Sequence, residues 1–276
     1  MATETNPLQP NPSQPAAASL LSRASVLAYG GISYAIFLGT FLYALGFVGG
    51  FGVPTSLDSA PSGPFWPALA VNLGLLTVFA LQHSVMARAP FKRWLSRWLP
   101  PAAERSTYVL LSSAALCLLF WQWRPMGGLV WHVEQPVAAA LLHAGFGFGW
   151  LLVLATTFLI HHFDLFGLRQ VWLFFRGEPY RQLRFVTPGP YRVVRHPLYL
   201  GWLCAFWFTP TMTVAHLTFA LATTAYILIA IRLEERDLVA IHGSDYQRYR
   251  ERTPMILPRL PRPAPASTER KAAAID

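Results

Sequence analysis

The stretch that decides the fold lies near the C-terminus and reads TPGPYRVVRHPLYLG from residue 187 to residue 201. A run without charged residues overlaps its end and extends from residue 197 to residue 231. The charged segment RLEERDL, residues 232–238, ends this run. The chain therefore places a basic, proline-containing segment at one end of an apolar run and an acidic and basic segment at the other.

A proline divides this apolar run. Pro210 lies between two threonines, and proline cannot donate a helical hydrogen bond and clashes with the preceding helical turn. We therefore expect a helical hairpin, with a short helix from about Leu198, a turn at residues 209–213 and a longer helix that returns near Arg236. Both charged segments would then lie on the same aqueous side, where they can form one site.

The composition indicates a polytopic membrane protein. The chain is 54% hydrophobic and 13% charged, whereas soluble domains average about a quarter charged residues. The net charge of +9 falls in blocks between apolar runs, as the positive-inside bias and anionic lipid headgroups require. We therefore expect the lipid bilayer, and not nucleic acid, as the partner.

Four further uncharged runs precede the hairpin. A membrane-spanning helix needs about 20 residues, and such helices are expected within residues 24–57, from Trp66 to residue 87, at residues 106–123 and at residues 135–160. The expected fold class is thus all-α: a polytopic integral membrane protein with four transmembrane helices followed by a C-terminal helical hairpin.

The domain organisation follows from these runs. Residues 1–22 are rich in proline, alanine, asparagine and glutamine and are expected to be a disordered lead. Residues 23–258 would form a single membrane domain, in which residues 187–258 form a ligand-binding module. Residues 259–276 would be a flexible tail.

Loop charges predict the orientation. The connection after the second span carries five basic residues and the one after the fourth carries six, whereas the first has none and the third only Arg124. Cytoplasmic loops collect positive charge. Both termini and the predicted site are therefore expected on the cytoplasmic side.

The segment Arg195-His196-Pro197-x-Tyr199-x-Gly201 is a candidate ligand site. Pro197 suits the first position of a helix, and the neighbouring free amides favour a carboxylate or a hydroxyl-rich ligand. Tyr199 offers an aromatic face, and Gly201 permits close approach. The alternative is an interfacial anchor at the start of a membrane helix.

The paired acidic residues Glu234 and Glu235 are the second candidate site. Two carboxylates at the membrane edge are costly unless they have partners or a function. A carboxylate binds ribose hydroxyls or an amine and complements a sulfonium ion. Arg232 and Glu235 are three residues apart and would share a helix face. The alternative is a solvated helix end.

These motifs resemble a known superfamily. From residue 188 to residue 258 the chain is similar to the isoprenylcysteine carboxyl methyltransferase and phospholipid methyltransferase superfamily of membrane enzymes. The shared elements include RHPxYxG at residues 195–201, RxEExxL at residues 232–238 and GxxYxxY at residues 243–249. The resemblance implies S-adenosylmethionine as the cofactor and no metal ion. The residues it implies for cofactor binding are Gly189, Tyr191, Arg195, His196, Pro197, Leu198, Tyr199, Gly201, Arg232, Glu234 and Glu235.

Motifs earlier in the chain narrow the resemblance. QHSVMAR at residues 82–88, ERSTY at residues 104–108 and HHFDLFGLRQ at residues 161–170 look like the bacterial methanethiol S-methyltransferases, relatives of the NnrU-type membrane proteins. That resemblance implies methanethiol as the acceptor, dimethyl sulfide as the product and the bacterial inner membrane as the location.

Methylation of a thiol requires a group that removes its proton. Even cysteine has a pKa of about 8.5, and the thiolate is the nucleophile. His161, His162 and Asp164 are the leading candidates, since His161 and Asp164 would share a face if the preceding helix continued. His83 is a further candidate for the same cavity. Arg195, Arg169 or Arg232 would lower the pKa of the thiol or hold the cofactor carboxylate, and the sequence does not rank the three. The alternative is an interfacial polar cluster.

The sequence also leaves two other functions open. The same cofactor site would serve a prenylcysteine carboxylate or a lipid acceptor, and the chain would also suit a non-catalytic, NnrU-like membrane protein. The intact glutamate pair argues against the second.

Overall fold

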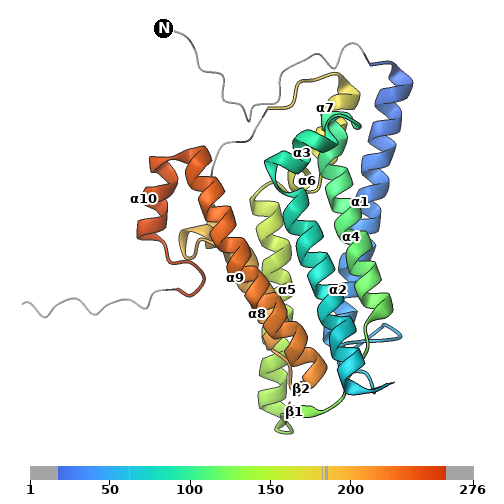
Figure 1. Cartoon of the computed structure of the whole chain (residues 1–276). Coiled ribbons are helices and arrows are strands. Elements are labelled where there is room, and N and C mark those ends of the chain that lie inside the picture. The colour runs from blue at the N-terminus through green and yellow to red at the C-terminus, as the bar shows by residue number, and fades with distance from the viewer. Residues whose placement is uncertain (1–17, 62, 182, 184–185, 259–276) are drawn as a thin grey trace, which may run out of the picture.

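The structure is a computed structural model that describes residues 18–61, 63–181, 183 and 186–258, and it is mostly helical (Figure 1). The long helices are α1 (Leu20–Gly49), α2 (Phe65–Met86), α4 (Glu104–Gln122), α5 (Pro136–Leu159), α8 (Pro197–Trp207) and α9 (Val214–His242). The short elements are α3 (Ala89–Leu95), η2 (Pro101–Ala103), α6 (His162–Leu165), α7 (Leu168–Arg176), η3 (Gly189–Arg192) and α10 (Ser244–Arg252). Strands β1 (Leu129–His132) and β2 (Thr211–Thr213) pair antiparallel, a small ribbon that the all-α prediction did not include.

Within the described residues, four helices are long and apolar enough to cross a membrane: α1, α2, α5 and α9. A helix of 20 residues spans about 30 Å, which matches the hydrocarbon thickness of a bilayer. The predicted third span appears as α4, which packs against α1 and α2 and carries Glu104 and Arg105 in its first turn. The chain is therefore an integral membrane protein, as its composition predicted.

Helix α1 begins inside the predicted disordered lead. Ser19 caps it by accepting a hydrogen bond from the amide of Ser22, and the helix starts at Leu20, so the lead is at least three residues shorter than predicted. Most of the lead, and all of the predicted tail at residues 259–276, lie outside the described residues.

Helices α5 and α8 pack backbone against backbone. A Cβ atom at Gly201 would lie 2.8 Å from the carbonyl oxygen of Gly149, and one at Gly149 would lie 2.6 Å from the amide nitrogen of Ala205. Real Cβ atoms do not approach so closely, so both positions require glycine. Gly147, two residues before Gly149 on α5, faces open space.

The apolar run does break at Pro210. Helix α8 ends at Trp207, β2 follows, and α9 begins at Val214. His196, just before α8, lies within hydrogen-bonding distance of Glu235 near the far end of α9. The two charged segments that flank the run thus meet at one end of the bundle.

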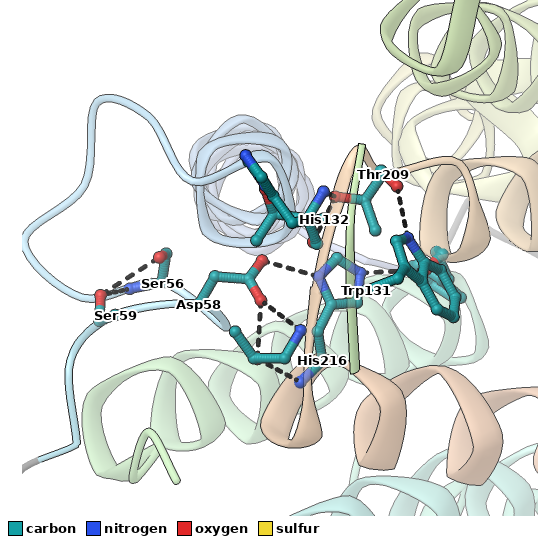
Figure 2. A network of polar contacts seen from close by, with 10 residues as sticks. Ser56, Asp58, Ser59, Trp131, His132, Thr209 and His216 are labelled. Carbon is teal, nitrogen blue, oxygen red and sulfur yellow. Dashed lines mark hydrogen bonds and ion pairs between the residues drawn. The ribbon is translucent and has the colours of Figure 1, made fainter. Parts of the chain in front are cut away.

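A polar network closes the other end of the bundle, where β1 and β2 lie (Figure 2). Asp58, in the loop after α1, accepts hydrogen bonds from the hydroxyl of Thr213 at 2.7 Å and from Nδ1 of His216 at 2.8 Å. Nε2 of His216 donates to the carbonyl oxygen of Phe206 at 3.0 Å. Both ring nitrogens therefore face acceptors, and the buried ring is held between Asp58 and a backbone carbonyl. This network fixes the start of α9, a structural role for His216.

Candidate active site

The first element of the site is a buried polar clamp. One carboxylate oxygen of Glu235 accepts a hydrogen bond from Nε of Arg195 at 2.7 Å and lies 3.0 Å from Nε2 of His196. All three side chains are nearly buried. Arg195 also donates to the carbonyl oxygens of Arg250 and Thr253.

The clamp joins three segments of the chain. Its side chains come from the two residues before α8 and from α9. The backbone amides of Arg195 and His196 connect it to the residues after α10 by donating to the carbonyl oxygens of Pro254 and Met255. A buried carboxylate that is paired and hydrogen-bonded in this way holds its surroundings in one geometry. Among the predicted cofactor residues, Arg195, His196 and Glu235 are thus placed to position the site.

The second element is Glu234, whose side chain points to a different face of α9. The hydroxyl of Tyr199 donates to one of its oxygens at 3.0 Å. The phenols of Tyr191 and Tyr108 are also close enough to this carboxylate to interact with its charge, and Tyr226 interacts electrostatically with Tyr199. Glu234 is exposed, so unlike Glu235 it remains open to a ligand.

These tyrosines stay protonated at neutral pH. Burial raises the pKa of the Tyr191 phenol well above its usual range, and the charge of Glu234 raises it further. Burial also raises the pKa of Tyr249, whose hydroxyl donates to the carbonyl oxygen of Tyr191, to about 12. A carboxylate with neutral aromatic rings around it suits a cation such as a sulfonium ion.

The third element is His83 in α2. Its Nε2 lies 2.7 Å from the hydroxyl of Tyr108, and its Nδ1 lies 3.2 Å from the hydroxyl of Ser112. Its ring is also 6.4 Å from that of Tyr226, centroid to centroid. Tyr108 therefore connects His83 to the surroundings of Glu234. Of the predicted proton acceptors, His83 is the one with a hydrogen-bonding contact, to Tyr108, that links it to the surroundings of Glu234.

An ion pair holds this part of α2 against α9. Arg88, just after α2, donates to a carboxylate oxygen of Asp237 at 2.7 Å. Ser84 donates to the hydroxyl of Tyr226 at 3.3 Å. These two contacts fix the distance between His83 and the polar part of α9.

The predicted sharing of a helix face by His161 and Asp164 is wrong. Helix α5 ends at Leu159, and His161 has a φ of 70°, a left-handed conformation that interrupts the helix. Asp164 instead forms an ion pair with Arg169 at 2.9 Å. His161 is exposed.

His162 is buried among α1, α5 and α6 with both ring nitrogens occupied. The hydroxyl of Thr157 donates to the carbonyl oxygen of Leu154, so it accepts from Nδ1 of His162 at 2.8 Å. Nε2 then accepts from the hydroxyl of Tyr34, also at 2.8 Å. Burial lowers the pKa of His162, which favours this neutral form. The arrangement fits a core histidine.

The other predicted cofactor residues around α8 have mixed surroundings. Pro197 is the first residue of α8, as predicted, and Leu198 is partly exposed beside it. Gly201 packs on the backbone of α5, so its close approach is to a helix and leaves no space for a ligand. Gly189, with a φ of 51°, begins η3 and faces Leu159.

Arg232 lies on another side of α9. It shares an open hollow of about 330 Å³ with Glu235, which confirms that the two residues share a face, and with Arg250 of α10. Residues two apart on a helix do not face each other, so Arg232 points away from Glu234.

Sequence reasoning missed Tyr108, Tyr226 and Asp237 as members of the site. Tyr108 ends the motif at residues 104–108 that carried the resemblance, so a signal for it was present. Tyr226 is a lone polar ring in an apolar run and Asp237 is one charge among several, so neither stands out without tertiary contacts.

Comparisons with known proteins identify the relatives of this chain. A family model described as phospholipid methyltransferase matches residues 143–245. The methanethiol S-methyltransferase of Crocosphaera subtropica is 55% identical over 240 residues, which cover 87% of this chain and 94% of the relative. The methanethiol S-methyltransferase of Mycobacterium tuberculosis is 53% identical over 238 residues, with coverages of 86% and 98%. Methanethiol S-methyltransferase 2 of Bradyrhizobium diazoefficiens is 54% identical over 241 residues, with coverages of 87% and 93%. No solved structure matches the chain.

The identity extends well beyond the ligand-binding module and covers most of the membrane domain. The protein is therefore a membrane methyltransferase, and the chain belongs to the methanethiol S-methyltransferase family.

Proposed function

We propose that the protein transfers a methyl group from S-adenosylmethionine to methanethiol and so forms dimethyl sulfide. The observation that carries this proposal is the convergence of Glu234, bonded to Tyr199, with the His83–Tyr108 pair. One half of this arrangement suits a cationic methyl donor, and the other suits a thiol that must lose its proton. The names of the relatives support the same acceptor.

The residues present fit the cofactor. When bound, S-adenosylmethionine supplies an electrophilic methyl group on a positively charged sulfur. Glu234 and the ring of Tyr199 would hold that positive charge, and the free amides at the start of α8 would receive the carboxylate or the ribose hydroxyls. The clamp of Arg195, His196 and Glu235 would keep α8 and α9 at a constant distance around it.

His83 is proposed as the base, with Tyr108 as the connecting hydroxyl. The thiol proton passes to the oxygen of Tyr108 while the Tyr108 proton passes to Nε2 of His83, 2.7 Å away. Ser112 accepts a hydrogen bond from the amide of Gln82, so it is suited to accept from Nδ1–H of His83 as well and thereby to leave Nε2 free as an acceptor. The thiolate sulfur would then be the nucleophile for an in-line displacement, the chemistry that the bound methyl donor would supply.

The site is proposed to lie at the cytoplasmic edge of a bacterial inner membrane, with both termini on that side. Arg88 and Arg105, from the predicted cytoplasmic connection, are at the same end of the bundle as Glu234. The positive-inside bias places such a basic end in the cytoplasm.

The test is headspace gas chromatography of purified protein supplied with methanethiol and S-adenosylmethionine. We expect dimethyl sulfide from the wild type. His83→Ala should lower kcat/KM at least about 100-fold, the usual contribution of a general base. His162→Gln, in the buried cluster beside α5, is the matched histidine control and should keep kcat/KM within about threefold.

Other outcomes would redirect the proposal. No dimethyl sulfide together with intact cofactor binding would move the acceptor to a prenylcysteine carboxylate or a lipid. A His162→Gln variant as inactive as His83→Ala, with its fold preserved, would contradict His83 as the sole base.

A further inference from the structure

A small hollow opens between α2 and α9 on the bilayer side of His83. Its volume is about 120 Å³, and its walls include Thr77 and Ala80 of α2 and Ala222 and Thr223 of α9. We call this hollow the α2/α9 groove. It belongs to the two helices that also carry His83 and Glu234, although it lies deeper in the membrane than either.

The groove has apolar walls despite its two threonines. The hydroxyl of Thr77 donates to the carbonyl oxygen of Leu73 at 2.7 Å, and that of Thr223 donates to the carbonyl oxygen of Phe219 at 2.7 Å. Both hydroxyl protons are thus used within their own helices, and the lining contains no charged side chain. Transfer of a charge into such surroundings is costly, so the groove suits an uncharged, apolar molecule.

The inner end of the groove reaches the proposed base. Phe79 and Tyr226 line the groove, and their ring centroids lie 5.3 Å and 6.4 Å from that of His83. The hydroxyl of Tyr226 accepts a hydrogen bond from Ser84, the residue that follows His83. These two rings therefore line the groove and also lie next to the ring of His83.

The size of the groove limits what it can hold. A dry protein cavity of about 150 Å³ binds benzene. A hollow of 120 Å³ accommodates methanethiol with room for few additional carbons, and it is too small for an acyl or prenyl chain. Ala80 and Ala222 project the smallest side chains of the wall, so they set the available width.

We propose that the α2/α9 groove is the acceptor subsite, which receives methanethiol from the bilayer as the uncharged thiol and limits the length of its alkyl group. This inference rests on the proposed function. The thiol remains protonated in the groove and loses its proton only on reaching Tyr108 and His83.

The test uses larger side chains to fill the groove, one from α9 and one from α2. Ala222→Leu and Ala80→Leu should each raise the KM for methanethiol at least tenfold while kcat stays within threefold, because the acceptor loses space but the base is untouched. Ala225→Leu, on an exposed position of α9 outside the groove lining, is the matched control and should leave the KM unchanged. Wild-type protein should prefer methanethiol to 1-butanethiol and should not use the charged 2-mercaptoethanesulfonate.

A third variant guards against misfolding. Ala222→Cys can be purified first and then alkylated with iodoacetamide, which forms a thioether on the folded protein with iodide as the leaving group; the thiol substrate cannot remove this cap by disulfide exchange. We expect the same rise in KM, with wild-type protein treated in parallel because it contains Cys117 and Cys204.

The outcomes separate this inference from the function on which it rests. If the wild type forms no thioether from any thiol, the proposed function fails. If it does form dimethyl sulfide but the filled or capped variants keep a wild-type KM and bind S-adenosylmethionine normally, the groove is not the acceptor subsite and the proposed function stands.

Discussion

Glu234 and Glu235 are adjacent, yet the structure predicts opposite consequences for their removal. Glu235 is paired inside the clamp, where its side chain and that of Arg195 are 13% and 11% exposed. Glu234 is exposed and accepts one hydrogen bond from Tyr199. We therefore expect Glu235→Ala to affect mainly stability and Glu234→Gln to affect mainly cofactor binding.

The magnitudes follow from these surroundings. Removal of one partner of a buried ion pair costs about 3–5 kcal/mol, and Arg195 keeps two carbonyl acceptors, so about 3 kcal/mol is expected for Glu235→Ala. For a chain of this size that corresponds to a decrease in Tm of roughly 6–12 °C. Glu234→Gln should cost less than about 1 kcal/mol of stability. A charged hydrogen bond contributes about 1.5–3 kcal/mol, so cofactor affinity should fall roughly 10–100-fold.

The assay measures both properties on the same detergent-purified protein. Thermal unfolding without ligand gives Tm, and calorimetric titration with S-adenosylmethionine gives Kd. Arg195→Met and the Arg195→Met/Glu235→Ala double variant complete a cycle, whose coupling energy should be at least about 1.5 kcal/mol for contacting charges.

Two results would refute this reasoning. The clamp would not be structural if Glu235→Ala left Tm unchanged and abolished cofactor binding. Glu234 would not be a ligand residue if Glu234→Gln lowered Tm as far as Glu235→Ala did, or if it left Kd unchanged.

Three further predictions concern stability and are measured by thermal unfolding in detergent. Gly201→Ala would place a Cβ atom 2.8 Å from a carbonyl oxygen of α5 and should lower the free energy of unfolding by at least about 2 kcal/mol. Gly147→Ala, in open space, should change Tm little. Equal effects would contradict the backbone contact. Burial lowers the pKa of His162, so below the unfolded value of about 6.5 the unfolded chain binds more protons than the folded one. The stability of the wild type should therefore fall from pH 7 to pH 5, and it should fall less steeply in His162→Gln. Parallel pH profiles would show that His162 is not the cause. Asp58→Ala would leave Nδ1 of the buried His216 ring without its acceptor and should cost about 1–3 kcal/mol. No measurable loss would argue against that contact.

Much of the architecture was predictable because lipid imposes a simple rule. A chain in a bilayer must satisfy its backbone hydrogen bonds within helices, so apolar length and the positions of charges and prolines largely define the elements. The break at Pro210 and the start of α8 at Pro197 followed from the missing amide proton of proline. The β1–β2 ribbon could not be predicted in this way, because it depends on pairing between segments about 80 residues apart.

The residue types of the site were predictable from the sequence, but the division of roles between those residues was not. Sequence identified both glutamates, Arg195, His196 and Tyr199, since their charges and polar groups are unusual beside apolar runs. It assigned the two glutamates one shared role, whereas their side chains point 100° apart around α9 and meet different partners.

The identity of the proposed base could not be predicted from the sequence. The sequence favoured the cluster of His161, His162 and Asp164 because its members are neighbours in the chain. The left-handed residue His161 interrupts the helix there and leaves His162 buried against Tyr34. His83 has fewer polar neighbours in the sequence than that cluster does. Only the packing of α2 beside α4 brings it to Tyr108. By itself the sequence determined the membrane class, the helices and the family motifs, because these depend on local composition and order. The tertiary structure decided which polar groups meet, because hydrogen bonds between helices depend on distances that sequence separation does not encode.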